Sequence, residues 1–322
     1  MPPQPTLADQ HIDSYLTDLS VGYDQPTSYF VADQVFPVVG SPKKSDKIAT
    51  FTRADLRRDE MQLRAPGAES AGGGYSVSRD SYACEVWASH IDVDDQTVAG
   101  SDNPYAPMED ATRVLVEREK IKREVRFAAE WFASSLWTGG TSNDPTAASL
   151  SAAWDDPAST PIEDLAEQGH NILLEFGREP NTLVLNNLGW LSLKNHPDVV
   201  DRIKYTSSEP VSEQLVARLL GLDRVLVSKA TRNTAAEGLT ETGASILGNS
   251  ALLVYAAPNP GRFVPSGGYT FVWTGYPGSR DGRRMRSFYL DKEASWRIEI
   301  ESAFDLKMVD ANAGVFITSV AS

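Results

Sequence analysis

Residues 108–137 decide the fold, and their sequence is MEDATRVLVEREKIKREVRFAAEWFASSLW. Apolar side chains recur here every three or four residues, which is the period of one helix face. This stripe consists of Ala111, Val114, Leu115, Arg118, Ile121, Val125, Ala128 and Phe132. The other face is expected to carry ion pairs at four-residue spacing, Glu119 with Arg123 and Arg126 with Glu130. A Thr-Gly-Gly sequence follows, so we predict one spine helix of about 30 residues and roughly 45 Å.

A second elongated element is predicted near the C-terminus. From Ser295 to Met308 the apolar residues share one parity and the charged residues share the other, which is typical of a strand with one buried face. The apolar set is Trp296, Ile298, Ile300, Phe304, Leu306 and Met308, and the charged set is Arg297, Glu299, Glu301, Asp305 and Lys307. The alternation is roughly two to three times the usual strand length. Residues 310–314 are expected to turn the chain, and residues 315–320 to return as the partner strand.

A projecting loop is predicted upstream of the helix. Residues 48–53 and 75–90 contain the β-branched and aromatic side chains of strands. Between them, residues 55–74 are polar and rich in glycine, so this tip cannot bury a core of its own. Two readings stay open for the tip, an arm that lies on a neighbouring subunit and a mobile surface loop. The only cysteine, Cys84, is interpreted as a buried apolar side chain rather than a catalytic thiol.

The remaining segments predict a short arm and a compact α/β lobe. Residues 1–40 contain several proline and glycine breakers and one helical pattern at residues 8–19. A helix is expected at residues 160–177, begun by a Thr-Pro-Ile-Glu capping box with Pro161 in its first turn. The lobe then alternates strands and helices, in the order strand 181–186, helices 188–195 and 212–220, and strand 223–228.

The composition excludes several classes of protein. Of the 322 residues, 41% are hydrophobic and 23% are charged, as in ordinary globular domains. No apolar run approaches the roughly 20 residues of a membrane span. The first residues lack the pattern of a secretory signal, so we expect a cytosolic product with no membrane partner. The net charge of -14 argues against tight binding to nucleic acid, although an acidic inner wall would suit a container for DNA.

Motifs that carry chemistry are absent from the sequence. No phosphate-binding glycine loop, nucleophile elbow or His-Glu-x-x-His pair occurs. Residues 92–95 resemble the start of a calcium loop, but Thr97 and Asn103 stand where such a loop needs glycine and glutamate. The sequence therefore predicts no catalytic, cofactor-binding or metal-binding residue.

Several runs of sequence stand out for their order and spacing rather than as strict motifs. They are NTLVLN at residues 181–186 with Trp190, Leu191, His196 and Pro197 after it, VLVSKATRNTA at 225–235, GNSALLVY at 248–255, GYTFVW at 268–273, and the ending at 310–320. With the predicted order of elements, these runs resemble the major capsid proteins of tailed bacteriophages, which have the Hong Kong 97-like fold that encapsulin shells share. The resemblance covers nearly the whole chain.

The resemblance implies an α+β fold with five parts. They are an N-terminal arm (1–40), an extended β-loop (41–100), a peripheral domain with the spine helix (101–178), an α/β axial domain (179–257), and closing β-strands of the peripheral domain (258–322), which complete a long thin sheet. The tip at residues 55–74 would overlie an adjacent subunit, and the axial lobe would point to the axis of a capsomer.

The resemblance also implies a function. Copies would form hexamers and pentamers and close into the icosahedral head shell of a tailed phage, around double-stranded DNA that is enclosed without sequence-specific binding. The virion would be assembled in the bacterial cytoplasm with a portal, with decoration proteins as further partners, and with a separate scaffolding protein, since no long extension precedes the arm. Two alternatives stay open, an encapsulin-like compartment shell and, from another class, an α/β hydrolase-type enzyme.

Some members of this family lock their shells with isopeptide bonds made by a lysine of the extended loop. No lysine occurs between Lys47 and Lys120, so we predict a non-covalent shell held by packing and arginine–carboxylate pairs. The residues expected at subunit boundaries are Arg53, Arg57, Arg58, Arg64, Glu117, Arg123, Arg283, Arg284 and Arg286. The last three form the densest basic cluster, interpreted as a loop between strands, with a patch that touches DNA as the alternative.

Overall fold

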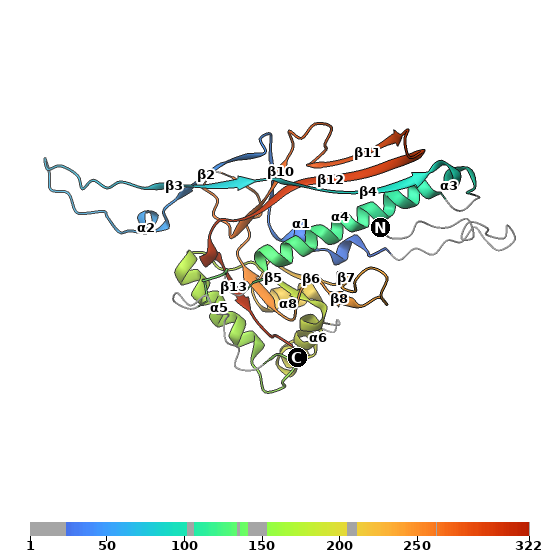
Figure 1. Cartoon of the computed structure of the whole chain (residues 1–322). Coiled ribbons are helices and arrows are strands. Elements are labelled where there is room, and N and C mark those ends of the chain that lie inside the picture. The colour runs from blue at the N-terminus through green and yellow to red at the C-terminus, as the bar shows by residue number, and fades with distance from the viewer. Residues whose placement is uncertain are drawn as a thin grey trace.

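The computed structural model describes residues 24–101, 106–133, 136–140, 153–204, 211–261 and 263–321. The helix expected at residues 8–19 lies outside these ranges. The molecule is elongated (Figure 1): a two-stranded loop projects from one end, a long helix runs beneath a sheet, and a lobe of short helices and strands lies below that helix. The predicted α+β class is confirmed.

The upper layer is a thin five-stranded sheet built on one long strand. This strand, β12 (Ser295–Met308), has the 14 residues over which the sequence alternates. Its N-terminal half lies between β11 (Arg283–Leu290) and β4 (Glu85–Asp94), and its C-terminal end pairs with β10 (Gly268–Trp273). β1 (Val38–Ser41) adds in parallel to β10, so this part of the N-terminal arm belongs to the sheet.

The basic cluster lies within β11, so the prediction of a loop at this place is wrong. Arg284 stands opposite Glu301 of β12 and forms an ion pair with it. Arg286 stands opposite Glu299, with 2.6 Å between guanidinium and carboxylate. Cross-strand pairs of opposite charge stabilise antiparallel strands. The glutamates at alternate positions of β12 therefore stabilise the arginine-rich segment as the adjacent strand.

Helix α4 (Pro107–Trp131) is the predicted spine, but it has 25 residues and ends before Trp137. The indole N–H of Trp137 donates to the carbonyl oxygen of Trp131, at 2.7 Å, and so satisfies an acceptor at the end of the helix that a further turn would otherwise have used. Both tryptophans are buried and pack in the core.

The buried face of α4 differs from the predicted stripe. Buried side chains recur every four residues and include charged ones: Ala111, Leu115, Glu119, Arg123, Phe127 and Trp131, with Glu124 beside them. The expected pair of Glu119 with Arg123 forms, at 3.6 Å, but on the buried face, so its placement on the exposed face is wrong. The pair of Arg126 with Glu130 lies partly exposed, at 2.6 Å. Val114 of the predicted stripe is 45% exposed.

Helix α5 (Pro161–Phe176) has the predicted bounds, with a proline in its first turn. It ends at Gly177, whose φ of +88° is the left-handed conformation that favours glycine after a helix. The predicted capping box is wrong, because Thr160 makes no side-chain cap hydrogen bond. Glu163 forms an ion pair with Arg202 of the neighbouring helix instead.

The lobe below α4 is built on a second sheet with strand order β13-β9-β5-β6. Its strands are β5 (Thr182–Asn186), β6 (Arg224–Ser228), β9 (Ala251–Val254) and β13 (Gly314–Ile317), and its helices are α6 (Asn187–Asn195), α7 (Pro197–Lys204) and α8 (Glu213–Leu219). A hairpin of β7 (Thr231–Asn233) and β8 (Gly243–Ser245) adjoins it. The predicted alternation is confirmed, with α7 as an addition.

The last strand pairs differently from the prediction. β13 pairs antiparallel with β9, with Val315 opposite Leu253, and not with β12. Both edges of β12 are occupied by β11, β10 and β4. All four residues of β13 are buried, a pattern that suits a sheet covered on both faces. The short turn η3 (Ala311–Ala313) carries the chain from the upper sheet to the lobe.

The extended loop is the hairpin of β2 (Ser45–Phe51) and β3 (Val77–Ala83). The strand predicted at residues 75–90 is divided at Cys84, so that β3 belongs to the loop and β4 to the main sheet. Cys84 is fully buried in a cluster with Tyr82, Tyr269 and Phe271. Burial raises the pKa of its thiol to about 11, which agrees with its interpretation as an apolar core residue.

Short helices complete the described chain, namely η2 (Thr27–Tyr29), α1 (Ala32–Val35), α2 (Arg53–Leu56) and α3 (Asp95–Ala99). Within the described ranges, no helix is both long enough and apolar enough to cross a membrane.

Candidate assembly site

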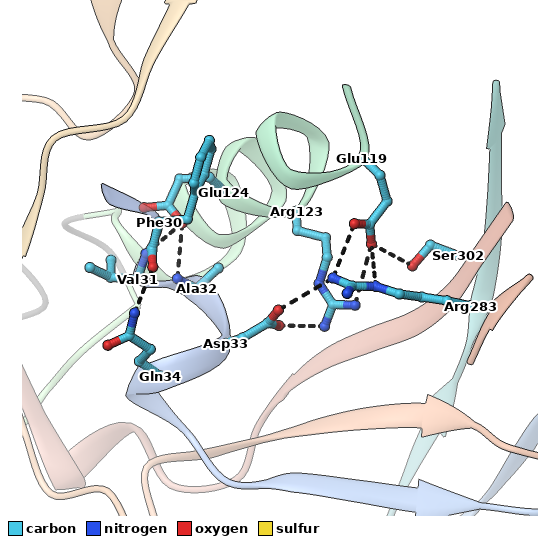
Figure 2. A network of polar contacts seen from close by, with 10 residues as sticks. All are labelled: Phe30, Val31, Ala32, Asp33, Gln34, Glu119, Arg123, Glu124, Arg283 and Ser302. Atoms are coloured by element: carbon cyan, nitrogen blue, oxygen red, sulfur yellow. Dashed lines mark hydrogen bonds and ion pairs between the residues drawn. The ribbon is translucent and has the colours of Figure 1, made fainter. Parts of the chain in front are cut away.

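Glu124 of α4 joins three parts of the chain. Its carboxylate accepts hydrogen bonds from the backbone N–H groups of Val31 (3.0 Å) and Ala32 (2.9 Å) at the start of α1, and from the hydroxyl of Ser228 on β6 (2.8 Å). Figure 2 shows the two bonds to the arm. The residue is completely buried. Burial raises the pKa of Glu124 above its ordinary value, although the three donors oppose this shift.

A second set of charges includes Arg123, which precedes Glu124 on the same helix, and Glu119, one turn before Arg123 (Figure 2). The guanidinium of Arg123 forms ion pairs with Glu119 and with Asp33 of α1. Glu119 also accepts from the guanidinium of Arg283 on β11 and from the hydroxyl of Ser302 on β12, each at 3.0 Å. These contacts connect the arm, the spine helix and the main sheet.

This network of charged side chains is structural, because it holds the arm, the helix and the sheet together. Each buried carboxylate faces several donors, and each buried cation faces a carboxylate, as buried charges require. Removing one partner would leave an uncompensated buried charge, so the arm, helix and sheet are held in one relative position. No group of three metal-ligating side chains occurs in the ranges that the structure describes.

The base of the extended loop is fixed by two arginines. Arg57 donates to the carbonyl oxygens of Leu174 (2.9 Å) and Glu175 (3.0 Å), at the C-terminus of α5, where a helix favours a cation. Arg53 lies 3.7 Å from the carboxylate of Asp310. These residues surround a cavity of about 670 Å³ between the loop and the body. The arginines therefore set the direction in which the loop leaves the body.

The tip of the loop exposes apolar side chains. Leu56 is 60% exposed, Met61 is 95% exposed and Leu63 is fully exposed. Its own contacts are weak: Arg58 lies 3.7 Å from Glu60, and Arg64 donates to the carbonyl oxygen of Ala68. Exposed pairs of this kind contribute about 0–1 kcal/mol each, so the tip has no interior of its own.

The residues predicted at subunit boundaries fall into two groups. The loop arginines Arg53, Arg57, Arg58 and Arg64 lie at the base and tip just described. The others lie along the body: Glu117 accepts from the backbone N–H of Gln25, Arg123 and Arg283 belong to the spine network, and Arg284 and Arg286 pair across β11 and β12. The structure thus gives each of the nine a partner within its own chain.

The sequence did not reveal that Glu124 and Asp33 connect the arm to the rest of the chain. One signal was present, because Glu119 and Arg123 lie in phase with Ala111, Leu115 and Phe127 at four-residue spacing. A charge in phase with an apolar stripe indicates a buried ion pair when a partner approaches from elsewhere. The partners of Glu124 come from residues 31, 32 and 228, which no local pattern could have placed there.

The calcium-like segment is used for structure. The carboxylate of Asp92 forms two hydrogen bonds of 2.7 Å with Arg297 on β12, and this guanidinium lowers the pKa of Asp92. Asp94 caps α3 by accepting from the backbone N–H and the hydroxyl of Thr97. Asn103, the last position of the pattern, lies outside the described residues.

Comparison with known proteins identifies a protein of similar sequence. No family model matches the chain. The major capsid protein of Burkholderia phage BcepMu is 26% identical over 277 residues, which cover 83% of this chain and 85% of that protein.

Solved structures share the fold at lower identity. A phage-related protein of Bordetella bronchiseptica superposes with a TM-score of 0.66 at 22% identity, over 92% of this chain and 94% of that one. The capsid of cyanophage P-SCSP1u gives a TM-score of 0.61 at 12% identity, over 98% and 94%. The encapsulin of Synechococcus elongatus gives 0.58 at 12% identity, over 98% and 95%.

The fold, the projecting loop and the sequence relationship agree with one another. Major capsid proteins are a structural rather than an enzymatic family, so the α/β hydrolase alternative falls away. The chain therefore has the Hong Kong 97-like fold, and over most of its length it is similar in sequence to the major capsid protein of a phage.

Proposed function

We propose that copies of this chain assemble as hexamers and pentamers into the icosahedral head shell that encloses the double-stranded DNA of a tailed phage. The observation that carries the proposal is the projecting loop, whose Met61 and Leu63 are almost wholly exposed on a segment without a core. Apolar side chains that are exposed on such a loop do not stabilise an isolated subunit, whereas a neighbouring subunit can cover them. The similarity to the BcepMu major capsid protein supports the same function.

Electron microscopy of purified protein tests the proposal. The wild-type chain, produced with and without its scaffolding protein, is expected to form capsomers or closed shells in negative stain. A variant with residues 57–74 replaced by a short Gly-Ser linker should keep the far-ultraviolet circular dichroism of the fold and stay unassembled. Discrete wild-type monomers at every concentration, under both conditions, would count decisively against a shell subunit.

A compartment shell of the encapsulin type is the second candidate, because the fold is shared. The sequence relationship favours the phage head, since identity is 26% to a phage capsid protein and 12% to the encapsulin. The contents of native particles decide between them. Nuclease-resistant double-stranded DNA is expected in a phage head, and a single enriched enzyme without DNA would instead identify a compartment.

The other proteins of the head are part of the proposal. We expect a separate scaffolding protein, a portal and, on the outer surface, decoration proteins. Of the nine residues predicted at boundaries, the exposed ones are the best candidates for contacts with these partners or with other copies. Arg58, at 62% side-chain exposure, can exchange its weak partner for one on a neighbour, whereas Arg123, at 8%, stays within the subunit.

A further inference from the structure

The spine helix α4 leaves one face open. Its other faces pack against β4 and β12 of the main sheet and bind the arm through Glu124. The open face consists of Val114, Arg118 and Ala129, which are exposed, and of Lys122, which is half-buried. Spacings of four and seven residues keep these four side chains on one side of the helix. None of them is acidic, so the open face is apolar and basic.

The cations of this face belong to a basic row of three residues. Arg118, Lys122 and Arg126 follow one another at four-residue spacing, so the row spans about 12 Å along the helix axis. Arg126 has Glu130 as its partner. Among the described residues, no ion pair joins Arg118 or Lys122 to a carboxylate. Two positive charges of the basic row are therefore left without a counter-charge in that part of the chain.

The indole ring of Trp87 on β4 holds the basic row in position. The ammonium group of Lys122 lies 3.9 Å from the centre of the ring, and the guanidinium of Arg126 lies 5.1 Å from it. Beside the row, Trp87 and Phe304 line a cavity of about 290 Å³ into which Arg118 also reaches. An aromatic ring attracts a cation but does not neutralise its charge. Lys122 is thus fixed in place and still able to bind an anion.

The densest basic cluster of the chain differs from this row, because it is neutralised internally. Arg284 and Arg286 of β11 form ion pairs with Glu301 and Glu299 of β12. The surplus of positive charge lies on α4 instead. In a chain with a net charge of -14, such a local surplus favours an anionic occupant from outside the subunit.

Double-stranded DNA is the anionic occupant that matches the basic row. DNA carries about one negative charge per 1.7 Å of its axis, so several phosphates lie beside a row of about 12 Å. The proposed function places such DNA against one wall of the shell. The net charge of the chain opposes tight binding, so the contact is weak and sensitive to salt.

We propose that the open face of α4 lies on the inner wall of the shell, where Arg118 and Lys122 bind phosphate groups of the packaged DNA. Contacts with phosphates carry no sequence information, so the site holds DNA of any sequence. Repeated over all subunits, two weak contacts per chain hold the outermost DNA without a strong single site. This inference rests on the proposed shell-building function and adds the surface that meets the enclosed DNA.

Charge reversal tests the contact. Arg118→Glu with Lys122→Glu should lower the temperature at which filled heads release their DNA, because like charges repel, and added salt should reduce the difference. The yield of DNA-free shells should not change, since the face binds DNA and not another protein. Arg113→Glu, at an exposed position of α4 outside the basic row, is the control and should match the wild type.

Two outcomes would overturn the inference. One is a release temperature of the double variant equal to that of the control. The other is a loss of DNA-free shells in the double variant alone, which would identify an acidic protein segment as the occupant of the basic row.

Cross-linking of wild-type heads gives an independent measurement. Formaldehyde joins a lysine amine to an amino group of a nearby base, and mass spectrometry of the digested heads locates the lysines that carry nucleotides. Filled heads should carry nucleotides on Lys122, and shells assembled without DNA should carry none. Lys47, exposed on β2 of the extended loop, is the control and should stay unmodified. Filled heads with no nucleotide on Lys122, or with as much on Lys47, would refute the contact and leave the shell function standing.

Discussion

Glu124 shows how one side chain can hold a subunit together. Its carboxylate accepts two backbone N–H groups of the arm and one hydroxyl of the lobe while it stands on the spine helix. Burial of this group is tolerated only because every oxygen has a donor. The neighbouring set of Glu119, Arg123 and Asp33 follows the same rule with ion pairs. Glu119, Arg123 and Glu124 thereby act as interior residues.

The pH dependence of stability tests the role of Glu124. Because burial raises its folded-state pKa above the ordinary 4.5, the folded protein holds this proton more tightly than the unfolded protein. The resulting stabilisation is complete below the unfolded pKa and is lost as pH rises through the folded pKa. Relative to Glu124→Gln, the wild type should therefore gain stability as pH falls from neutral toward 4.5, measured by urea unfolding of unassembled subunits. Parallel stability curves for the two proteins would contradict the assignment.

Two further variants complete the test of this residue. Glu124→Ala leaves two N–H groups and a hydroxyl without an acceptor and should cost about 3 kcal/mol of unfolding free energy. Glu130→Gln is the matched control on the same helix, because its pair with Arg126 is partly exposed. Its effect should be within about 0.5 kcal/mol.

The thiol of Cys84 should be inert in the folded protein. It is fully buried, so a thiol reagent in solution cannot reach it. Burial also raises its pKa to about 11, so little reactive thiolate is present near neutral pH. A thiol-reactive chromogenic disulfide should label no thiol in native buffer at pH 8 and one thiol per chain in denaturant. Rapid labelling of the native protein would show that the cluster around Cys84 opens readily.

At the scale of elements, the spacing of apolar residues predicted most of the helices and strands. The bounds of α5, the length of β12 and the strands β5 and β6 follow from apolar spacing, prolines and glycines that act locally. The end of α4 was predicted too late, because its stop includes a side-chain hydrogen bond from the Trp137 indole to the Trp131 carbonyl, which the spacing of apolar residues does not reveal. The pairing of β13 was wrong because it depends on which sheet edges are already filled.

Replacement of Trp137 by phenylalanine tests this helix stop. Trp137→Phe keeps an aromatic ring but removes the N–H that bonds to the Trp131 carbonyl, and it should lower the free energy of unfolding by about 1–2 kcal/mol. Trp273→Phe is the control, because its indole N–H bonds to the Pro42 carbonyl near the surface. Equal losses in urea unfolding for both variants would contradict a special role for the buried bond.

At the scale of the whole molecule, the subunit is elongated, and the extended loop projects from one end (Figure 1). The spine network fixes the arm and both sheets to one helix, and Arg57 with Arg53 fixes the direction of the loop. A rigid body with one directed projection can repeat its contacts around a ring and from ring to ring.

The shell should contain no covalent links between subunits. The loop tip has arginines but no lysine, and a guanidinium does not act as the amine nucleophile of an isopeptide bond. Purified shells boiled in detergent and reductant should run as a single band near 35.1 kDa. Bands at multiples of that mass would require a covalent link at some other residue.

The sequence by itself determined most of the elements, the absence of recognised catalytic motifs and the family resemblance, because these depend on local period, breakers and the order of segments. It also determined that the loop tip lacks a core, since residues 55–74 contain few apolar side chains. Only the tertiary structure decided that Glu119, Arg123 and Glu124 are buried and that β13 joins the lobe. The reason is physical: burial of a charge and choice of a strand partner depend on groups distant in sequence, whose approach no local pattern records.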